Sequence, residues 1–358
     1  ISAHRPLQRT DAPMTLDGLL VLDLTHVVAG PMATKTLRDL GARVIKVEGP
    51  GRAPWRPAGD VCRYLEPRLD QPDGSKGDSA YFATLNSGKE SIVLQLDPSS
   101  EIGDPAGDRA TFEAMLARAD VVVENFRTGV LDELGYSWEV LHAKYPRLIL
   151  ASISGFGQTG PYAHRKAVDT IIQGMSGFIA STGTQEAPTK VGTTVSDLLA
   201  GVYCATGVLA ALHRRAVRGE GSRVDVSMLD TSFAFHAREA AGYHVRQSEP
   251  PRLGNTSPIG LYPFDVFECQ RGELFSVHAG GEVEFRRFCE ILGAPEVAAD
   301  ARFQTMEGRW QHMVDLRAAI TARTKQWDRD QLLAEFLKLR GSESFPVGPV
   351  SGFAELRA

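Results

Sequence analysis

A strand–helix–strand pattern at the start of the chain limits its possible folds more than any other feature. Residues 19–24, LLVLDL, are apolar and have the length of a buried strand. Pro31 suits the first turn of a helix, which is predicted over 31–40 and ends at Gly41. Residues 43–47 form a second strand. Such a unit joins two parallel strands through a right-handed crossover, so the sequence predicts a parallel sheet.

The same alternation continues along the chain and predicts an α/β fold. The large domain is expected to be doubly wound and Rossmann-like, over residues 14–246. A stretch with Pro, Ser and Gly at 247–257 indicates a linker, and a smaller α+β domain is expected over 258–345. Residues 1–13 are polar and indicate a flexible arm or a non-native remnant. Further strands are predicted at 91–94, 121–123, 148–153, 224–228, 264–268 and 274–278, and helices near 110–118, 137–144, 197–217, 229–246, 282–292, 312–323 and 329–338.

The charge balance and cysteine spacing argue against several kinds of partner. With 39 Lys and Arg against 44 Asp and Glu, the net charge is −5, so nucleic acid is not an expected partner. No run of eighteen apolar residues occurs, and no membrane span is expected. The four cysteines are far apart, which predicts neither a disulfide framework nor a zinc site. A reducing cytoplasm suits them, although a eukaryotic organelle is also compatible.

The turn after the first strand does not carry a dinucleotide signature. It reads THVVAGP over residues 25–31, without Gly-x-Gly-x-x-Gly. Neither a Walker-type phosphate loop nor a His-Glu-x-x-His metal motif is present. We therefore expect no permanently bound cofactor and no metal ion.

Asp197 follows a turn rich in Gly and Thr and begins a long helix with apolar residues at helical spacing. A carboxylate at a helix start is favoured by the helix dipole and is expected to stay ionised. Such a residue either caps the helix or acts as a nucleophile. The helix-cap interpretation is the more common one for an isolated sequence.

Four segments stand out when they are taken in their order along the chain. They are residues 21–31 with 40–48, residues 85–92, residues 123–129, and residues 154–162 continuing to 197–201. Together they resemble class III CoA-transferases, the family of formyl-CoA transferase and the carnitine CoA-transferases, and the four are far more specific than any one alone. The similarity runs from residue 16 to about 358, and α-methylacyl-CoA racemases share the scaffold.

The resemblance implies a CoA-transferase that uses Asp197 as a covalent nucleophile. Asp197 attacks an acyl-CoA to form a mixed anhydride and then an aspartyl-CoA thioester, from which CoA passes to a free carboxylic acid. The implied partners are acyl-CoA and a small carboxylic acid, with CoA as a substrate. The resemblance also implies an interlocked, ring-like homodimer, with residues 346–358 beginning a segment that returns to the large domain.

The resemblance further implies a set of CoA contacts, each with a structural alternative. Backbone N–H groups ahead of a helix can meet a phosphate or an oxyanion, whereas His26 can simply end a strand. Asn125 and Phe126 suit the pantetheine chain or the adenine, but also a strand-end cap and a core ring. Lys166 suits a phosphate or a solvated loop. The implied CoA-binding residues are His26, Val27, Val28, Ala29, Asn125, Phe126 and Lys166, with Arg52 and Asp169 as additional candidates.

The chain departs from the family pattern at positions that bear on its reaction. Val28 stands where some members carry a Gln that contacts the reacting group, which indicates acids other than formate or oxalate. Gly49 and Glu133 stand where CoA-binding Arg residues are common, so phosphate recognition is expected to be redistributed. Racemases need a second proton carrier, and Val168 occupies its place. A racemase, and a catalytically silent CoA-binding protein, remain the alternatives.

Overall fold

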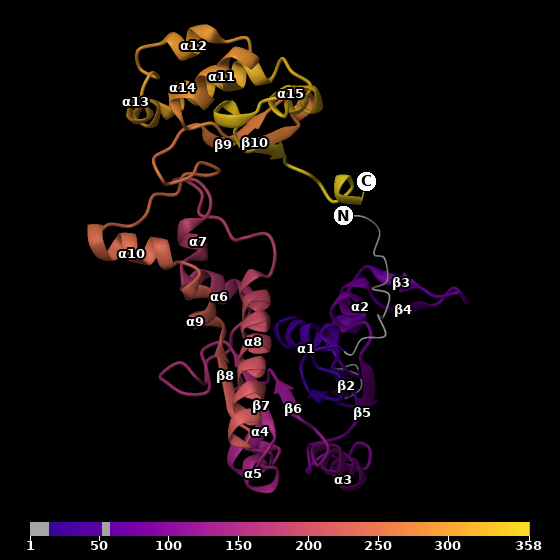
Figure 1. The fold of residues 1–358 in the computed structure, drawn as a ribbon. Coiled ribbons are helices and arrows are strands. Elements are labelled where there is room, and N and C mark those ends of the chain that lie inside the picture. The colour runs from indigo at the N-terminus through magenta and orange to yellow at the C-terminus, as the bar shows by residue number, and fades with distance from the viewer. Residues whose placement is uncertain (1–13, 52–57, 358) are drawn as a thin grey trace. The chain divides into compact units, whose positions relative to one another are not determined.

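The computed structural model describes residues 14–51 and 58–357 (Figure 1). These residues group into two compact units. The large unit contains residues up to 180 and 190–250, and the small unit contains 181–189 and 251–357. Residues 181–189 thus group with the small unit, although the predicted large domain ran without interruption from 14 to 246. The predicted arm, 1–13, and Arg52 lie outside the described residues, and the predicted interlocked homodimer stays a prediction.

The predicted parallel sheet is confirmed in the large unit. Six parallel strands stand in the order β5-β2-β1-β6-β7-β8. The chain runs outward from β1 to β2 and β5, and then returns to the other side of β1 as β6, β7 and β8. The order in which the chain adds strands therefore reverses between β1 and β6. The strands are β1 Leu20–Asp23, β2 Arg43–Glu48, β5 Glu90–Val93, β6 Val121–Glu124, β7 Ile149–Ser154 and β8 Arg223–Ser227.

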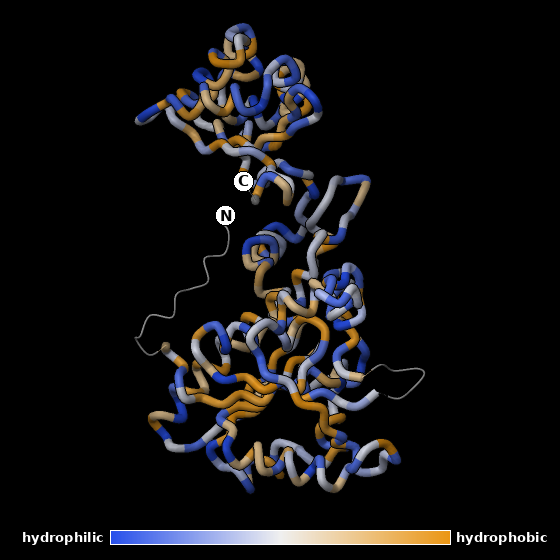
Figure 2. Tube along the Cα trace, turned by 90° about the vertical axis from the view of Figure 1, so that its right-hand side faces the viewer, coloured by the Kyte–Doolittle hydropathy of each residue, from blue (hydrophilic) through white to orange (hydrophobic). Residues whose placement is uncertain are grey.

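Helices cover both faces of this sheet, because successive residues of a strand point to opposite faces. Val21 and Val123 join the core beneath α1 (Ala29–Asp39) and α8 (Val195–Arg218). Leu22 and Val122 join the core beneath α3 (Pro105–Leu116) and α5 (Trp138–Lys144). Figure 2 shows apolar residues concentrated in the strands of this sheet. The remaining elements of the large unit are β3 Arg68–Asp70, β4 Lys76–Ser79, α2 Ala80–Asn86, α4 Val130–Glu133, α6 Asp169–Ser176, α7 Phe178–Ser181, α9 Met228–Ala234 and α10 Ala237–Arg246.

The helix predicted after residue 228 needs correction. The single helix predicted after residue 228 is divided into α9 and α10, and the break places His236 against the ring of Phe178, with ring centroids 4.6 Å apart.

By length and composition alone, α8 is apolar enough to cross a membrane. One face of α8 is buried against α1 and the sheet, as in a core helix. The expected absence of a membrane span stays a prediction.

The small unit is an α+β arrangement with an aromatic core. Its three strands stand in the antiparallel order β11-β10-β9. Residues 346–358, predicted to begin a segment that returns to the large domain, start with β11, which pairs with β10 in this sheet. The return itself stays a prediction. The strands are β9 Phe264–Glu268, β10 Leu274–His278 and β11 Val347–Pro349, and the helices are α11 Glu282–Ile291, α12 Pro295–Ala299, α13 Met306–Gln311, α14 Met313–Thr324 and α15 Arg329–Phe336.

A buried ion pair connects β1 to the start of β5. Asp23 is fully buried, and its carboxylate lies 2.9 Å from the ammonium group of Lys89. Burial by itself would raise the pKa of Asp23, but Lys46, Lys89 and the hydroxyl groups of Thr25 and Thr34 hold it well below its ordinary value. The carboxylate is therefore a fixed negative charge beside α1, where the Thr34 hydroxyl donates to it.

We predict that Lys89→Ala lowers the free energy of unfolding by about 3 kcal/mol or more, because Asp23 would lose its direct ionic partner inside the protein. Urea unfolding measures this change. Arg43→Ala is the control, since Arg43 forms an ion pair with Glu90 at the surface, where solvent screens the charges. A loss in Lys89→Ala no larger than in Arg43→Ala would contradict the prediction.

Candidate active site

The main pocket lies where the carboxyl ends of β1, β6 and β7 meet, within the large unit. Its volume is about 610 Å³. The pocket thus lies between β1 and β6, where the strand order reverses. Open α/β sheets usually bind ligands at such a point. The pocket is lined by residues 26–29 after β1, 125–128 after β6, and 153–155 at the end of β7, together with Tyr81, Ala163, residues 165–170, Lys190, Thr194, Asp197 and Met228.

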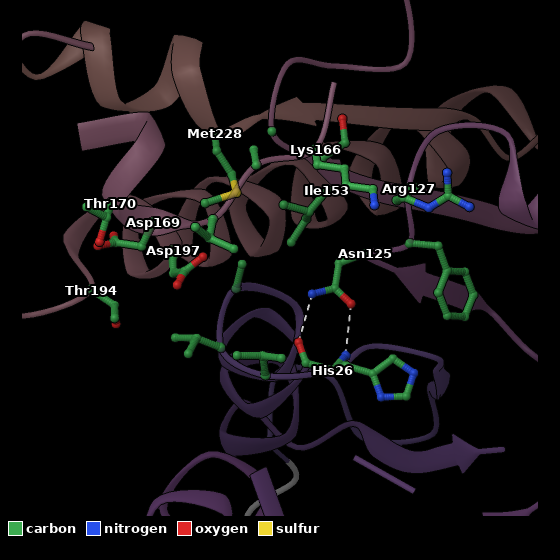
Figure 3. A pocket seen from close by; sticks show the side chains of 18 of the residues that line it. His26, Asn125, Arg127, Ile153, Lys166, Asp169, Thr170, Thr194, Asp197 and Met228 are labelled. Atoms are coloured by element: carbon green, nitrogen blue, oxygen red, sulfur yellow. Dashed lines mark hydrogen bonds between the residues drawn. The ribbon is translucent and has the colours of Figure 1, made fainter. Parts of the chain in front are cut away.

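Asp197 extends into this pocket from the first turn of α8 (Figure 3). The helix cap is Thr194, and no side chain caps the helix. Within the described part of the chain, no hydrogen-bond donor or cation contacts the Asp197 carboxylate. The helix-cap interpretation is therefore wrong, because the side chain faces the cavity and leaves its oxygens available to a ligand.

The charge state of Asp197 also differs from the expectation. Burial, followed by the nearby charge of Asp169, raises the pKa of Asp197 to about 7. The helix dipole favours the ionised form. Desolvation and a like charge oppose that effect and outweigh it here. Asp197 is therefore poised between its protonated and ionised forms at neutral pH, rather than held permanently ionised.

Asp169 fixes the start of α8. It is the first residue of α6 and is buried. One of its oxygens accepts a hydrogen bond from the Ser196 N–H at 2.9 Å, and the other accepts one from the Gln173 side chain at 2.6 Å. In Figure 3 the side chains of Asp169 and Asp197 lie next to each other. Asp169 thus holds the residue before Asp197 in place and supplies the charge that raises the pKa of Asp197.

The turn over residues 26–29 forms the opposite wall of the pocket. The Asn125 side chain accepts a hydrogen bond from the His26 N–H and donates one to the His26 carbonyl, both at 2.8 Å (Figure 3). Asn125 was predicted to contact CoA, but in this structure its amide already binds the backbone of His26. No described residue accepts a hydrogen bond from the N–H groups of Val28 or Ala29, which begin α1. These two groups are available to a ligand.

Basic side chains gather at the end of the pocket away from the carboxylates. Figure 3 shows Lys166 and Arg127 on the far side of Ile153 from Asp197. Arg165 also lines the pocket and lies over the ring of Tyr162, 4.6 Å from its centroid. Neither Arg127 nor Arg165 is among the predicted CoA contacts, although Arg127 follows the predicted pair 125–126 and Arg165 stands beside Lys166.

Other lining residues carried no recognisable signal in the sequence. Tyr81 and Met228 come from separate places in the chain, and Lys190 and Thr194 belong to the turn before Asp197, where only Asp197 was predicted to act. No periodicity or short motif connects them, so only the fold brings them together. Arg52, a candidate additional contact, lies outside the described residues. Across residues 14–51 and 58–357, no group of three or more His, Cys, Asp or Glu side chains is arranged to hold a metal ion.

Known proteins resemble this chain both in sequence and in fold. The sequence model that describes CoA-transferase family III matches residues 16–358 of this chain. An acetyl-CoA:oxalate CoA-transferase from Acetobacter aceti is 43% identical over 342 residues, which cover 95% of this chain and 81% of the relative. A succinate–glutarate CoA-transferase from Agrobacterium fabrum is 37% identical and is aligned over 96% of this chain and 82% of its own.

A solved structure shows the same architecture. The crystal structure of a CAIB/BAIF family protein from Brucella suis has a TM-score of 0.86 and 37% identity, and covers 96% of this chain and 86% of its own. The chain belongs to CoA-transferase family III. The predicted enzyme class, a CoA-transferase, is confirmed.

The raised pKa predicts how Asp197 affects stability. The ordinary carboxyl value is 3.8 and the value in the folded protein is about 7, so the folded protein holds this proton more tightly than the unfolded chain. The contribution of Asp197 to stability therefore falls as pH rises through this interval. We predict that Asp197→Asn, measured by urea unfolding, is more stable relative to wild type at pH 8 than at pH 5.

The same comparison in an Asp169→Asn background tests the physical cause. Removal of the Asp169 charge leaves burial as the remaining cause, so the difference between pH 5 and pH 8 should become smaller. An Asp197→Asn effect that does not change between the two pH values would show that Asp197 titrates normally.

Proposed function

We propose that the protein transfers CoA from an acyl-CoA thioester to a free carboxylic acid, with Asp197 as the covalent nucleophile. The observation that carries the proposal is the position of the Asp197 carboxylate, which lies inside the pocket at the start of α8 and receives no hydrogen bond from the described residues. Family membership supplies the reaction class, and the geometry supplies the nucleophile. At pH 7 and above, a substantial fraction of Asp197 is ionised and able to attack.

The proposed reaction proceeds through two kinds of acyl-enzyme bond. An Asp197 oxygen attacks the thioester carbonyl carbon, and the C–S bond breaks. CoA thiolate departs, and a mixed anhydride between Asp197 and the acyl group forms. The thiolate then attacks the Asp197 carbonyl carbon, which releases the donor acid and forms an aspartyl-CoA thioester. The acceptor carboxylate attacks that carbonyl carbon and displaces CoA thiolate, giving a second mixed anhydride. Attack of the thiolate on the acceptor acyl carbon forms the new CoA ester and restores Asp197.

The wall opposite Asp197 is suited to the charge that develops in these steps. Each attack places negative charge on a carbonyl oxygen, which backbone N–H groups stabilise when they are already in place. We assign this role to the N–H groups of Val28 and Ala29, because both residues line the pocket and neither donates to another described residue. The positive end of the α1 dipole adds to the effect.

The distribution of charge in the pocket suggests the orientation of CoA. Arg127 and Lys166 lie at one end, Arg165 is the neighbour of Lys166 in the lining, and all three are suited to the CoA phosphates. They supply the cations that the family pattern would place at Gly49 and Glu133. With the phosphates at that end, the pantetheine chain extends toward Asp197. This orientation brings the sulfur to the nucleophile.

Small dicarboxylic acids are the acceptors that we propose, and we include oxalate, although Val28 by itself had indicated acids other than oxalate. The relatives named above are CoA-transferases of oxalate and of succinate and glutarate. Lys190 lines the same pocket as Asp197 and can pair with the carboxylate that does not react. Val28 is buried and apolar where a polar side chain would contact the reacting group, so the substrate carbonyl meets backbone donors instead.

We predict that Asp197→Ala abolishes transfer of CoA from acetyl-CoA or succinyl-CoA to oxalate, succinate or glutarate. New CoA esters are measured by mass spectrometry over all donor and acceptor pairs. During turnover by the wild-type enzyme, hydroxylamine should convert Asp197 to a hydroxamate, because it intercepts an activated carboxyl group. Removal of a side chain that caps nothing should leave the fold intact.

Asp230→Ala is the matched control for this experiment. Asp230 occupies the same position in the first turn of α9 as Asp197 does in α8, but it does not line the pocket. The Asp230 variant should keep wild-type activity. Normal transfer by Asp197→Ala would exclude Asp197 as the nucleophile.

We predict that Lys166→Ala weakens CoA binding by about 1–2 kcal/mol, the scale of a charge-assisted hydrogen bond to a phosphate. Isothermal titration with CoA and with 3′-dephospho-CoA locates the contact, since only one of the two ligands carries the ribose phosphate. Lys144→Ala is the control, because Lys144 is exposed on α5 and outside the pocket. Equal affinities for the Lys166 variant and the wild type would contradict the proposed orientation.

A further inference from the structure

The turn that lines the pocket contains a residue in a strained conformation. Val27 has a φ angle of 67°, in the left-handed region. That region is costly for β-branched side chains, and such residues adopt it only where the surrounding structure enforces it. Val27 stands immediately before Val28 and Ala29, whose N–H groups face the substrate in the proposed mechanism. Whatever holds Val27 in place therefore also determines where those two groups point.

A fully buried carboxylate, that of Asp60, binds the backbone of Val27. The Val27 N–H donates to both oxygens of Asp60, at 3.1 and 3.2 Å. The Cys62 N–H donates to the same carboxylate at 3.0 Å, and the Cys62 thiol donates to the Val27 carbonyl at 3.7 Å. Both polar backbone groups of Val27 are thus bound by residues 60–62, which do not line the pocket.

A buried cation completes the arrangement. The Lys46 ammonium group lies 3.3 Å from Asp60 and donates to the Thr25 carbonyl at 2.6 Å. The backbone N–H of Asp60 donates to Glu48 at 2.7 Å, which fixes Asp60 itself. The residues before and at the strained position are therefore held through Lys46 and Asp60, and both of these side chains are inaccessible to solvent.

We propose that Asp60 is a positioning residue for CoA transfer, which holds Val27 in its left-handed conformation and so aims the N–H groups of Val28 and Ala29 into the pocket. This inference rests on the proposed function of the pocket. Loss of Asp60 lets Val27 relax toward a negative φ angle, and the two N–H groups move away from the carbonyl oxygen of the substrate. The cations that hold the CoA phosphates lie on other segments and keep their places.

The position of the turn predicts which kinetic parameter changes. Asp60→Ala should lower kcat by roughly 10- to 100-fold, the scale of a small misplacement of catalytic groups. The KM for acyl-CoA should change by less than about threefold, because CoA binding depends mainly on the distant cations. A role in folding alone would lower the melting temperature and the active fraction, but not kcat per folded molecule.

A double-mutant cycle with Val27→Gly isolates the contact. Glycine adopts the left-handed conformation without strain, so the turn in Val27→Gly depends less on Asp60. Asp60→Ala should then cost less than about threefold in kcat in the Val27→Gly background, against tenfold or more in the wild-type background. Equal losses in the two backgrounds would overturn the proposal, and so would wild-type kcat in Asp60→Ala.

Asp120→Ala is the control for a partly buried carboxylate that, like Asp60, binds a backbone N–H and a basic side chain. Asp120 accepts a hydrogen bond from the Leu20 N–H at 2.8 Å and pairs with Arg215 at 2.9 Å, at the opposite end of β1 from the pocket. This variant should lose stability while kcat per folded molecule stays at the wild-type value. Circular dichroism and active-site titration with hydroxylamine give the folded and active fractions.

If Asp60→Ala does not fold, Asp60→Asn replaces it in the same cycle, since it keeps the shape and one acceptor oxygen. The decisive result is again a smaller loss in the Val27→Gly background than in the wild-type background. Asp197→Ala distinguishes the two proposals. An active Asp197→Ala enzyme refutes the proposed nucleophile, whereas an inactive Asp197→Ala enzyme beside an unaffected Asp60→Ala enzyme refutes only the positioning role.

Discussion

The close packing of α1 against α8 determines the geometry of the site. Gly201 lies where the two helices meet, and a Cβ atom at this position would stand 2.6 Å from the Ala29 carbonyl oxygen. Only glycine permits this approach without movement of the backbone. Because the contact joins the first residue of α1 to the second turn of α8, it brings the starts of both helices to one pocket. Asp197, Val28 and Ala29 consequently line the same pocket.

Two opposing electrostatic effects act at this place. Helix starts attract negative charge, whereas burial and a second carboxylate repel it. At Asp197, burial and the charge of Asp169 outweigh the helix dipole, and the pKa of Asp197 rises to about 7. Asp23 shows the opposite outcome in a fully buried position, because Lys89 and two hydroxyl groups bind it and the charge of Lys46 lies nearby. The difference between these carboxylates is the number of partners that each receives, not the depth of its burial.

The charges beneath the pocket have a different role from the charges that line it. Asp60 and Lys46 are inaccessible to solvent, and they bind the backbone of the turn after β1. Arg127, Arg165 and Lys166 are exposed at the end of the pocket and remain available to an anionic ligand. A buried charge that binds backbone groups gives rigidity, and an exposed charge beside a cavity gives affinity for a substrate. The site combines the two within a few strands of one sheet.

The amino-acid sequence by itself determined the order of strands and helices, because burial on one helix face or on two strand faces leaves a period in the sequence. It also placed Asp197 at the start of α8 and indicated the family. The tertiary structure alone decided that Asp169 lies beside Asp197, that Asp60 binds Val27, and that α9 and α10 are separate helices. These facts depend on contacts between residues far apart in the chain, for which no local pattern exists. The pKa of Asp197 belongs with them, since desolvation is a property of the folded surroundings and not of the residue.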